Sequence, residues 1–140
     1  NDCTNFVSQA LHAGGIPMRK NIQPYDEAPN WWIQSGDAGQ WLYAVPWVNA
    51  DEFFDLIRNS TTIDGVDAGG MPENLMLGDI VSYDKYDDGS MNHTAIVTNT
   101  DDYYNPLVTY HTSDRKNVSW DYYVVNTSAF TSFEFTNIID

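Results

Sequence analysis

The sequence predicts an α+β domain in which N-terminal helices pack on an antiparallel β-sheet. Apolar residues recur at helical spacing over 2–11 and 47–59, whereas from residue 77 onward short apolar stretches alternate with turn residues. Helices followed by a run of strands are typical of α+β folds. The 140 residues, 42% of them hydrophobic, can form one core, so 1–140 is treated as a single domain.

The first predicted helix begins at the only cysteine of the chain. Asp2 is the expected N-cap, because its carboxylate can accept a backbone N–H group that a helix leaves unpaired at its start. The apolar residues that follow at helical spacing are Phe6, Val7, Ala10 and Leu11. Gly14-Gly15 ends the helix. Cys3 would then lie where the helix dipole favours a thiolate, and a buried structural cysteine is the alternative interpretation.

Residues 16–47 are predicted to be irregular, because prolines interrupt any long helix there. The segment contains Trp31, Trp32, Trp41 and Trp47. Their rings either form a small core or line a substrate groove; packing is favoured for most of them, and Trp32 and Trp47 are the candidates for substrate contact. A second helix is expected over 47–59 with Asn49 as its N-cap, followed by a linker loop over 60–76.

The sheet is predicted from short stretches rich in β-branched and aromatic residues. The expected strands are 77–83, 93–98, 107–112, 122–125 and 133–135. Asp84, Asp87 and Asp88 with Gly89 look like a fragment of a calcium loop, but no glutamate follows at the distance such a loop requires. A hairpin turn is therefore favoured there, and neither a metal nor another cofactor is predicted.

The formal charge of −14, from 20 acidic and 6 basic residues, limits the partners of the chain. It disfavours binding to nucleic acids and to anionic membrane surfaces. No apolar stretch approaches the roughly 20 residues of a membrane-spanning helix. A single cysteine allows no internal disulfide. Because the cysteine motif is already under way at Asn1, we expect the chain to be a piece of a longer or processed protein, with other domains of the same polypeptide among its partners.

Two histidines are predicted to lie at one end of the sheet. His93 opens a strand and His111 lies near the end of the next, so antiparallel pairing through the 101–106 turn brings them together. If the first helix starts there, Cys3 joins them. A thiol attacks an acyl carbon as the thiolate and needs a base whose tautomer a third polar group fixes. His12 is interpreted as a packing or solvent-facing residue.

Four blocks carry a resemblance to a known family. They are Asp-Cys-Thr-Asn-Phe-Val-Ser-Gln at 2–9, Gly-Asp-Ile-Val at 78–81, His-Thr-Ala-Ile-Val at 93–97 and Tyr-His-Thr-Ser-Asp at 110–114. In this order the sequence resembles the "putative amidase domain" of bacteria, a branch of the NlpC/P60 (papain-like) cysteine peptidase superfamily. The resemblance implies a papain-like fold and cysteine-dependent cleavage of an amide bond, often in cell-wall peptides. Cys3 matches the nucleophile and His93 the base.

The remaining roles are expectations of the same resemblance. His111 is favoured as the residue that orients His93, with Asp114 as the competitor. Asp2 and Asn5 are expected near the substrate. The substrate would be a peptide or a muropeptide of the cell wall, cleaved by a secreted or wall-associated bacterial enzyme. A catalytically silent module that binds peptide or glycan, and an acyltransferase that shares the thioester intermediate, are the alternatives.

Overall fold

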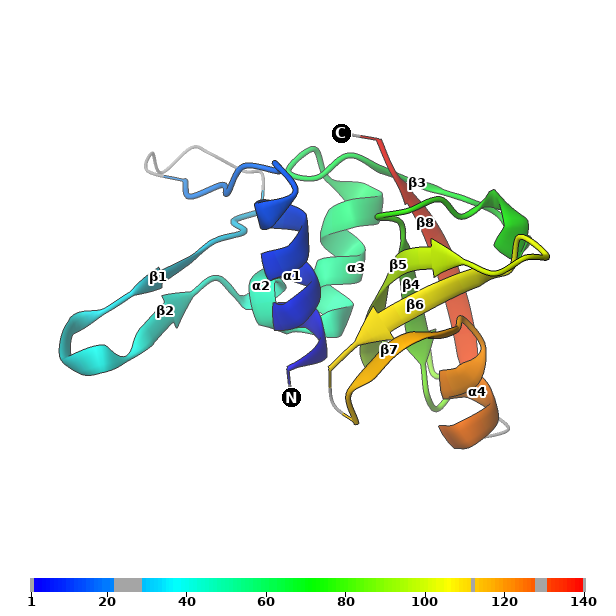
Figure 1. Cartoon of the computed structure of the whole chain (residues 1–140). Helices are drawn as coiled ribbons and strands as arrows, with labels where there is room; N and C mark the ends of the chain where they lie inside the picture. The colour runs from blue at the N-terminus through cyan, green and yellow to red at the C-terminus, as the bar shows by residue number, and fades with distance from the viewer. Residues whose placement is uncertain (1, 22–28, 112, 128–130, 140) are drawn as a thin grey trace.

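The computed structural model describes residues 2–21, 29–111, 113–127 and 131–139, and Figure 1 shows helices beside a β-sheet. The helices are α1 (Cys3–Ala13), α2 (Val45–Val48), α3 (Ala50–Asn59) and α4 (Tyr122–Thr127), with 3-10 turns at Asp37–Gly39 and Pro72–Asn74. The strands are β1 (Ile33–Ser35), β2 (Trp41–Tyr43), β3 (Gly65–Asp67), β4 (Ile80–Asp84), β5 (His93–Thr100), β6 (Pro106–Tyr110), β7 (Arg115–Ser119) and β8 (Ser132–Ile138). The predicted α+β class is confirmed.

Six strands form one sheet in the order β3-β8-β4-β5-β6-β7, and every neighbouring pair is antiparallel. The C-terminal strand β8 therefore lies between β3 and β4. The predicted linker over 60–76 is wrong in part, because it contains β3. Gly65 can open this strand beside α3 because it lacks a side chain: a Cβ there would lie 2.5 Å from the carbonyl oxygen of Ile57.

The sheet separates two apolar cores. Along β4, Ile80 belongs to the core under α1 and α3, whereas the next residue, Val81, belongs to the core on the opposite face. This alternation follows from the two-residue period of a strand. In β5, Ile96 faces the helices and Ala95 faces away. By the same alternation, Thr94 faces the helices and His93 belongs to the other face.

The first helix forms where the sequence predicts it, but its N-terminal contact is different. Asp2 occupies the N-cap position, as predicted, but its side chain does not form the predicted hydrogen bond to the backbone in the first turn of the helix. The Asp2 carboxylate instead accepts hydrogen bonds from Asn5 Nδ2 at 2.7 Å and from His111 Nδ1 at 2.8 Å. A contact with His111, which directly follows β6, thus takes the place of the local side-chain cap.

The second predicted helix is divided at Asn49 into α2 and α3. Asn49 has an extended backbone conformation, and its side-chain oxygen accepts a hydrogen bond from the backbone N–H of Glu52 at 2.9 Å, so the predicted N-cap is confirmed. The segment before α2 is not irregular throughout, contrary to what its prolines predict, because it contains the hairpin of β1 and β2, in which Ile33 pairs with Tyr43.

Two predictions for the last third of the chain are wrong. Residues 122–125 form part of helix α4, although tyrosine and valine favour strands. The neighbouring polar stretch 115–119, for which no strand was expected, forms the edge strand β7. Packing of the partly buried Tyr123 against the sheet explains the helix, because tertiary packing outweighs the weak intrinsic preference of a short segment.

The turn after β4 is the hairpin that the sequence predicts. The Asp84 carboxylate accepts hydrogen bonds from the backbone N–H groups of Asp88 at 3.2 Å and Gly89 at 2.7 Å. Within the described residues, no group of three or more His, Cys, Asp or Glu side chains could hold a metal ion. The helices that the structure describes are all too short or too polar to cross a membrane.

Candidate active site

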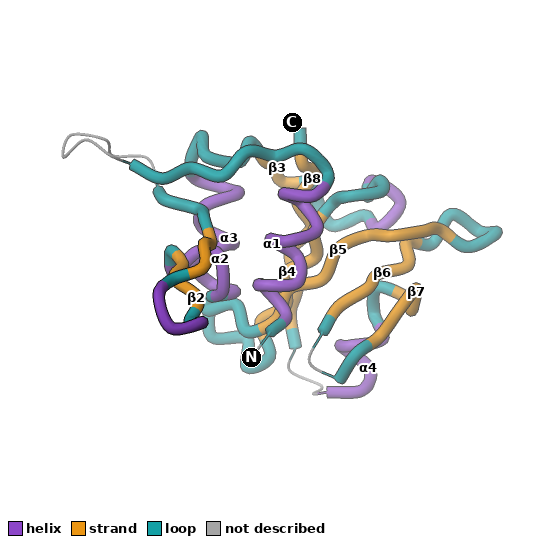
Figure 2. Tube along the Cα trace, turned by 60° about the vertical axis from the view of Figure 1, so that its left-hand side comes forward, coloured by secondary structure: helices purple, strands orange, loops and turns teal. Residues whose placement is uncertain are grey.

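The start of α1 lies against the start of β5, as the contacts between these elements and both views indicate (Figures 1 and 2). The Oγ1 atoms of Thr4 and Thr94 are 3.0 Å apart and share a buried hydrogen bond. Each threonine directly follows one of the predicted reactive residues, Cys3 and His93. Two segments that are about ninety residues apart in sequence are thus joined at one end of the sheet.

Cys3 is enclosed at this junction. Its side chain is 1% exposed, and its Sγ atom lies 3.7 Å from the hydroxyl oxygen of Thr4. The cysteine therefore occupies the first turn of α1, as the sequence predicts, and is shielded from bulk water.

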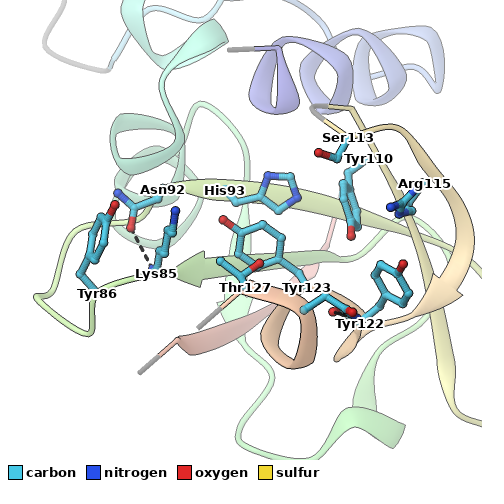
Figure 3. A pocket seen from close by; sticks show the side chains of 11 residues that line it. Lys85, Tyr86, Asn92, His93, Tyr110, Ser113, Arg115, Tyr122, Tyr123 and Thr127 are labelled. Atoms are coloured by element: carbon cyan, nitrogen blue, oxygen red, sulfur yellow. Dashed lines mark hydrogen bonds between the residues drawn. The ribbon is translucent and has the colours of Figure 1, made fainter. Parts of the chain in front are cut away.

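Aromatic rings surround His93 (Figure 3). The ring of Tyr123, from α4, stacks on the imidazole at 4.2 Å between centroids with an interplanar angle of 11°. The ring of Tyr110, from β6, meets it edge-on at 4.4 Å, and Tyr83 lies at 5.5 Å. His93 is only 3% exposed. These rings fix the plane of the imidazole by packing.

Burial controls the charge of His93. Desolvation lowers the pKa of the imidazole to about 4, because a charged ring is disfavoured away from water. The ring is therefore neutral at pH 7, the form in which one nitrogen can accept a proton. Its Nε2 atom is buried and has no hydrogen-bond partner among the described residues. A buried nitrogen of this kind calls for an explanation, and proton transfer is one.

Tyr123 connects the imidazole to the cysteine. Burial raises the pKa of the Tyr123 hydroxyl, and the electrostatic interaction with Cys3 raises it further. The ring that stacks on His93 is thus within electrostatic range of Cys3. The arrangement brings one thiol, one neutral imidazole and one phenol to the same end of the sheet.

Among the described residues, no hydrogen bond, ion pair or ring contact joins His111 to His93. Its Nδ1 atom lies 2.8 Å from the Asp2 carboxylate, and its ring stacks on Phe6 of α1 at 4.2 Å. The preceding residue, Tyr110, points to the opposite face and touches His93. The expectation that His111 orients the base is therefore corrected: the alternation of the chain turns its ring toward α1.

Asp114, the competing candidate, is exposed, and within the described part of the chain its carboxylate forms no hydrogen bond or ion pair with His93. It lines a separate hollow of about 540 Å³ beside His111 and Phe6. Neither predicted orienting group is in place. Instead, the rings of Tyr110 and Tyr123 pack against the imidazole. The contact with Tyr123 is not predictable from the strand-like composition of 122–125.

The four residues predicted to contact the substrate lie in different surroundings. Trp47 is 1% exposed in the core under α1, where its Nε1 donates a hydrogen bond to Asn5 Oδ1 at 2.9 Å, so it is a packing residue. Asn5 and Asp2 are tied into the same hydrogen-bonded chain. Trp32 is half-buried, and the Lys20 ammonium lies 4.3 Å from its ring centre. None of the four lines the cavity beside His93.

That cavity has a volume of about 670 Å³ and lies between β5, β6 and α4 (Figure 3). His93, Tyr110 and Tyr123 form its centre, and Lys85, Arg115 and Tyr122 lie around it. The sulfur of Cys3 is not part of its lining. The cavity can hold a small peptide next to the imidazole.

Comparisons with known proteins show the family of the chain. The family model described as "Putative amidase domain" matches residues 1–134. The chain is 35% identical over 144 residues to "Uncharacterized protein YhbB" of Bacillus subtilis (strain 168), and the match covers 99% of this chain and 42% of the relative. It is 37% identical over 128 residues to "Uncharacterized protein YjcM" of the same strain, and that match covers 86% of this chain and 27% of the relative.

The chain thus spans less than half the length of either relative. No solved structure matches it. The family model covers nearly the whole chain, including the start of α1, the strand that begins at His93 and the segment that contains His111. The chain therefore belongs to the putative amidase domain family, and its domain is amidase-like.

Proposed function

We propose that this domain hydrolyses an amide bond with Cys3 as nucleophile and His93 as general base and acid. The observation that carries the proposal is the buried Thr4–Thr94 hydrogen bond, which joins the residues that follow Cys3 and His93. Membership of an amidase-like family supports the reaction class. The kinship to the NlpC/P60 superfamily remains part of this proposal and rests on the four sequence blocks.

The proposed reaction has two halves. The neutral imidazole of His93 takes the proton of the Cys3 thiol, and the sulfur attacks the carbonyl carbon of the amide. The C–N bond then breaks, and the imidazolium gives its proton to the departing amine. A water molecule attacks the resulting thioester, with His93 taking its proton, and the carboxylic acid leaves as the thiol reforms. Backbone N–H groups at the start of α1 could stabilise the oxyanion.

The proposed substrate is a bacterial cell-wall peptide or a related peptide, and the proposed location is secreted or wall-associated. The two Bacillus subtilis relatives support a bacterial setting. A second candidate is a module of the same fold that binds peptide without cleaving it. The enclosure of Cys3, which is 1% exposed and does not line the cavity, favours this candidate over the acyltransferase.

Release of amine from muropeptides and model peptide amides tests the proposal. The wild type, Cys3→Ala and Cys3→Ser should be compared, since serine keeps the volume of the buried site but is a far weaker nucleophile. We expect cleavage by the wild type and loss in both variants, with unchanged melting temperatures as the folding control. Equal cleavage by all three proteins would refute the role of Cys3. Binding without cleavage by the wild type would favour the silent module.

A further inference from the structure

The charges around the His93 cavity differ from those of the rest of the chain. The sequence has 20 acidic and 6 basic residues. Among the described residues, eleven line the cavity, and none of them is acidic, whereas Lys85 and Arg115 are basic. The cavity is therefore a local positive region on a strongly negative protein.

Among the described residues, no carboxylate forms an ion pair with either of the two cations. Within the described part of the chain, the ion pairs involve Arg58 and His111 but neither Lys85 nor Arg115. Each of the two lies over a tyrosine ring instead: the Lys85 ammonium is 5.4 Å from the centre of Tyr86, and the Arg115 guanidinium is 5.2 Å from that of Tyr122. A ring of this kind holds a cation in place without cancelling its charge, so the charge is available to a ligand.

The positions of these cations relative to His93 suggest how a ligand would lie. In Figure 3, Lys85 is on one side of the imidazole, next to Asn92, and Arg115 is on the other, next to Tyr110. Lys85 comes directly after β4, and Arg115 begins β7. A peptide that passes over His93 would therefore meet a cation at each end of the cavity.

We propose that the cavity recognises peptides with free carboxylates, held by Lys85 and Arg115 on the two sides of His93. This inference rests on the proposed function for its location, since the amide to be cleaved would lie at His93. Carboxylates suit the cations because charge-assisted hydrogen bonds to ammonium and guanidinium groups are strong. A carboxylate is favoured over a dianionic phosphate because the −14 charge of the chain repels a ligand more as the ligand's own charge increases.

Binding to the Cys3→Ala protein tests the inference apart from turnover. The ligands are acetyl-Ala-Glu-Ala and the same peptide with Gln in place of Glu and a C-terminal amide, measured by calorimetry at low and high salt. We expect the acidic peptide to bind about tenfold more tightly than the neutral one at low salt. In the Lys85→Gln/Arg115→Gln double variant that preference should disappear.

Two control variants make the result specific. Lys116→Gln removes the same charge from a residue next to Arg115 that does not line the cavity, and it should keep the preference. Lys85→Arg/Arg115→Lys keeps both charges and should keep most of it. No binding of the acidic peptide, an equal preference in the double variant, or an equal loss in Lys116→Gln would overturn the inference.

Failure of this inference and failure of the proposed function would give different results. Cleavage by the wild type without a preference for carboxylates would overturn the inference and leave the hydrolase proposal standing. A carboxylate preference without any cysteine-dependent cleavage would overturn the hydrolase proposal and leave a carboxylate-binding cavity.

Discussion

The two histidines near the start of α1 lie in contrasting surroundings. His93 is 3% exposed, is packed between tyrosine rings and has its pKa lowered to about 4 by burial. The side chain of His111 is 41% exposed and paired with Asp2. One is a desolvated neutral imidazole beside a cavity, and the other forms a surface contact with the residue that precedes α1. A histidine's sequence context does not distinguish these surroundings, whereas the side of the sheet to which its ring points does.

The largest expected effect separates the two histidines in catalysis. We expect His93→Gln to lower kcat/KM about a thousandfold, because general acid–base catalysis is lost. We expect His111→Gln to lower it less than about tenfold, because an exposed ion pair contributes little. Amine release from a cleavable peptide, with melting temperatures for both variants, measures the difference. Equal losses in the two variants would mean that the contrast in burial has no functional meaning.

The next effect concerns stability in acid. Between pH 6.5 and 4 the unfolded chain protonates His93 and the folded protein does not, so the free energy of unfolding falls as the pH falls through this window. The loss should reach about 3 kcal/mol at pH 4. Urea unfolding at several pH values should show this loss in the wild type and in His111→Gln, and a smaller one in His93→Gln. The same pH dependence in all three proteins would contradict the burial of His93.

A smaller effect should follow from removing the ring that stacks on His93. Tyr123→Ala opens the imidazole to water, so we expect the pKa of His93 to rise by about one unit or more towards its ordinary value. Tyr123→Phe keeps the ring and should change this pKa much less. NMR titration of the His93 ring protons measures both. An unchanged pKa in Tyr123→Ala would show that another group excludes water.

The smallest effect is expected at the surface pair. Hydrogen bonds from His111 and then Asn5 lower the pKa of the Asp2 carboxyl below 3.8, so the pair stabilises the fold above that value and is lost as the pH falls. Both side chains are about half exposed, so solvent screening limits the contribution. We expect Asp2→Asn to cost less than about 1 kcal/mol by urea unfolding at pH 7. If Asp2→Asn lowered the free energy of unfolding as much as His93 protonation does, the pair would be a major contributor to the stability of α1.

Regular patterns made much of this fold predictable from the sequence. The helical stripe after Cys3, the Asn49 cap and the Asp-Gly turn each depend on local chemistry, and each is present in the structure. The failures involve distant contacts. Tyr122-Tyr123 has strand-like composition but forms a helix, because Tyr123 packs on residues of β4, β5 and β6 that are distant in sequence.

The candidate site, like the fold, was predictable only in part. The meeting of the Cys3 and His93 segments follows from the order of helix and strands. The orientation of His111 does not, because antiparallel pairing brings two residues to one end of the sheet without deciding which face each side chain occupies. Tyr110 lies in the core away from α1, and the ring of the next residue, His111, stacks on Phe6 of α1. Lys85 and Arg115 are unremarkable in the sequence, and only the fold brings them to one cavity.

The most direct test of the central claim is the intact mass of the protein during turnover. The chain has one cysteine, so an acid-quenched acyl adduct that hydroxylamine removes can be assigned to Cys3. We predict such an adduct on the wild type, none on Cys3→Ala, and much slower formation on His93→Gln. Turnover that continues in Cys3→Ala, with no adduct on the wild type, would contradict the claim that Cys3 and His93 act together.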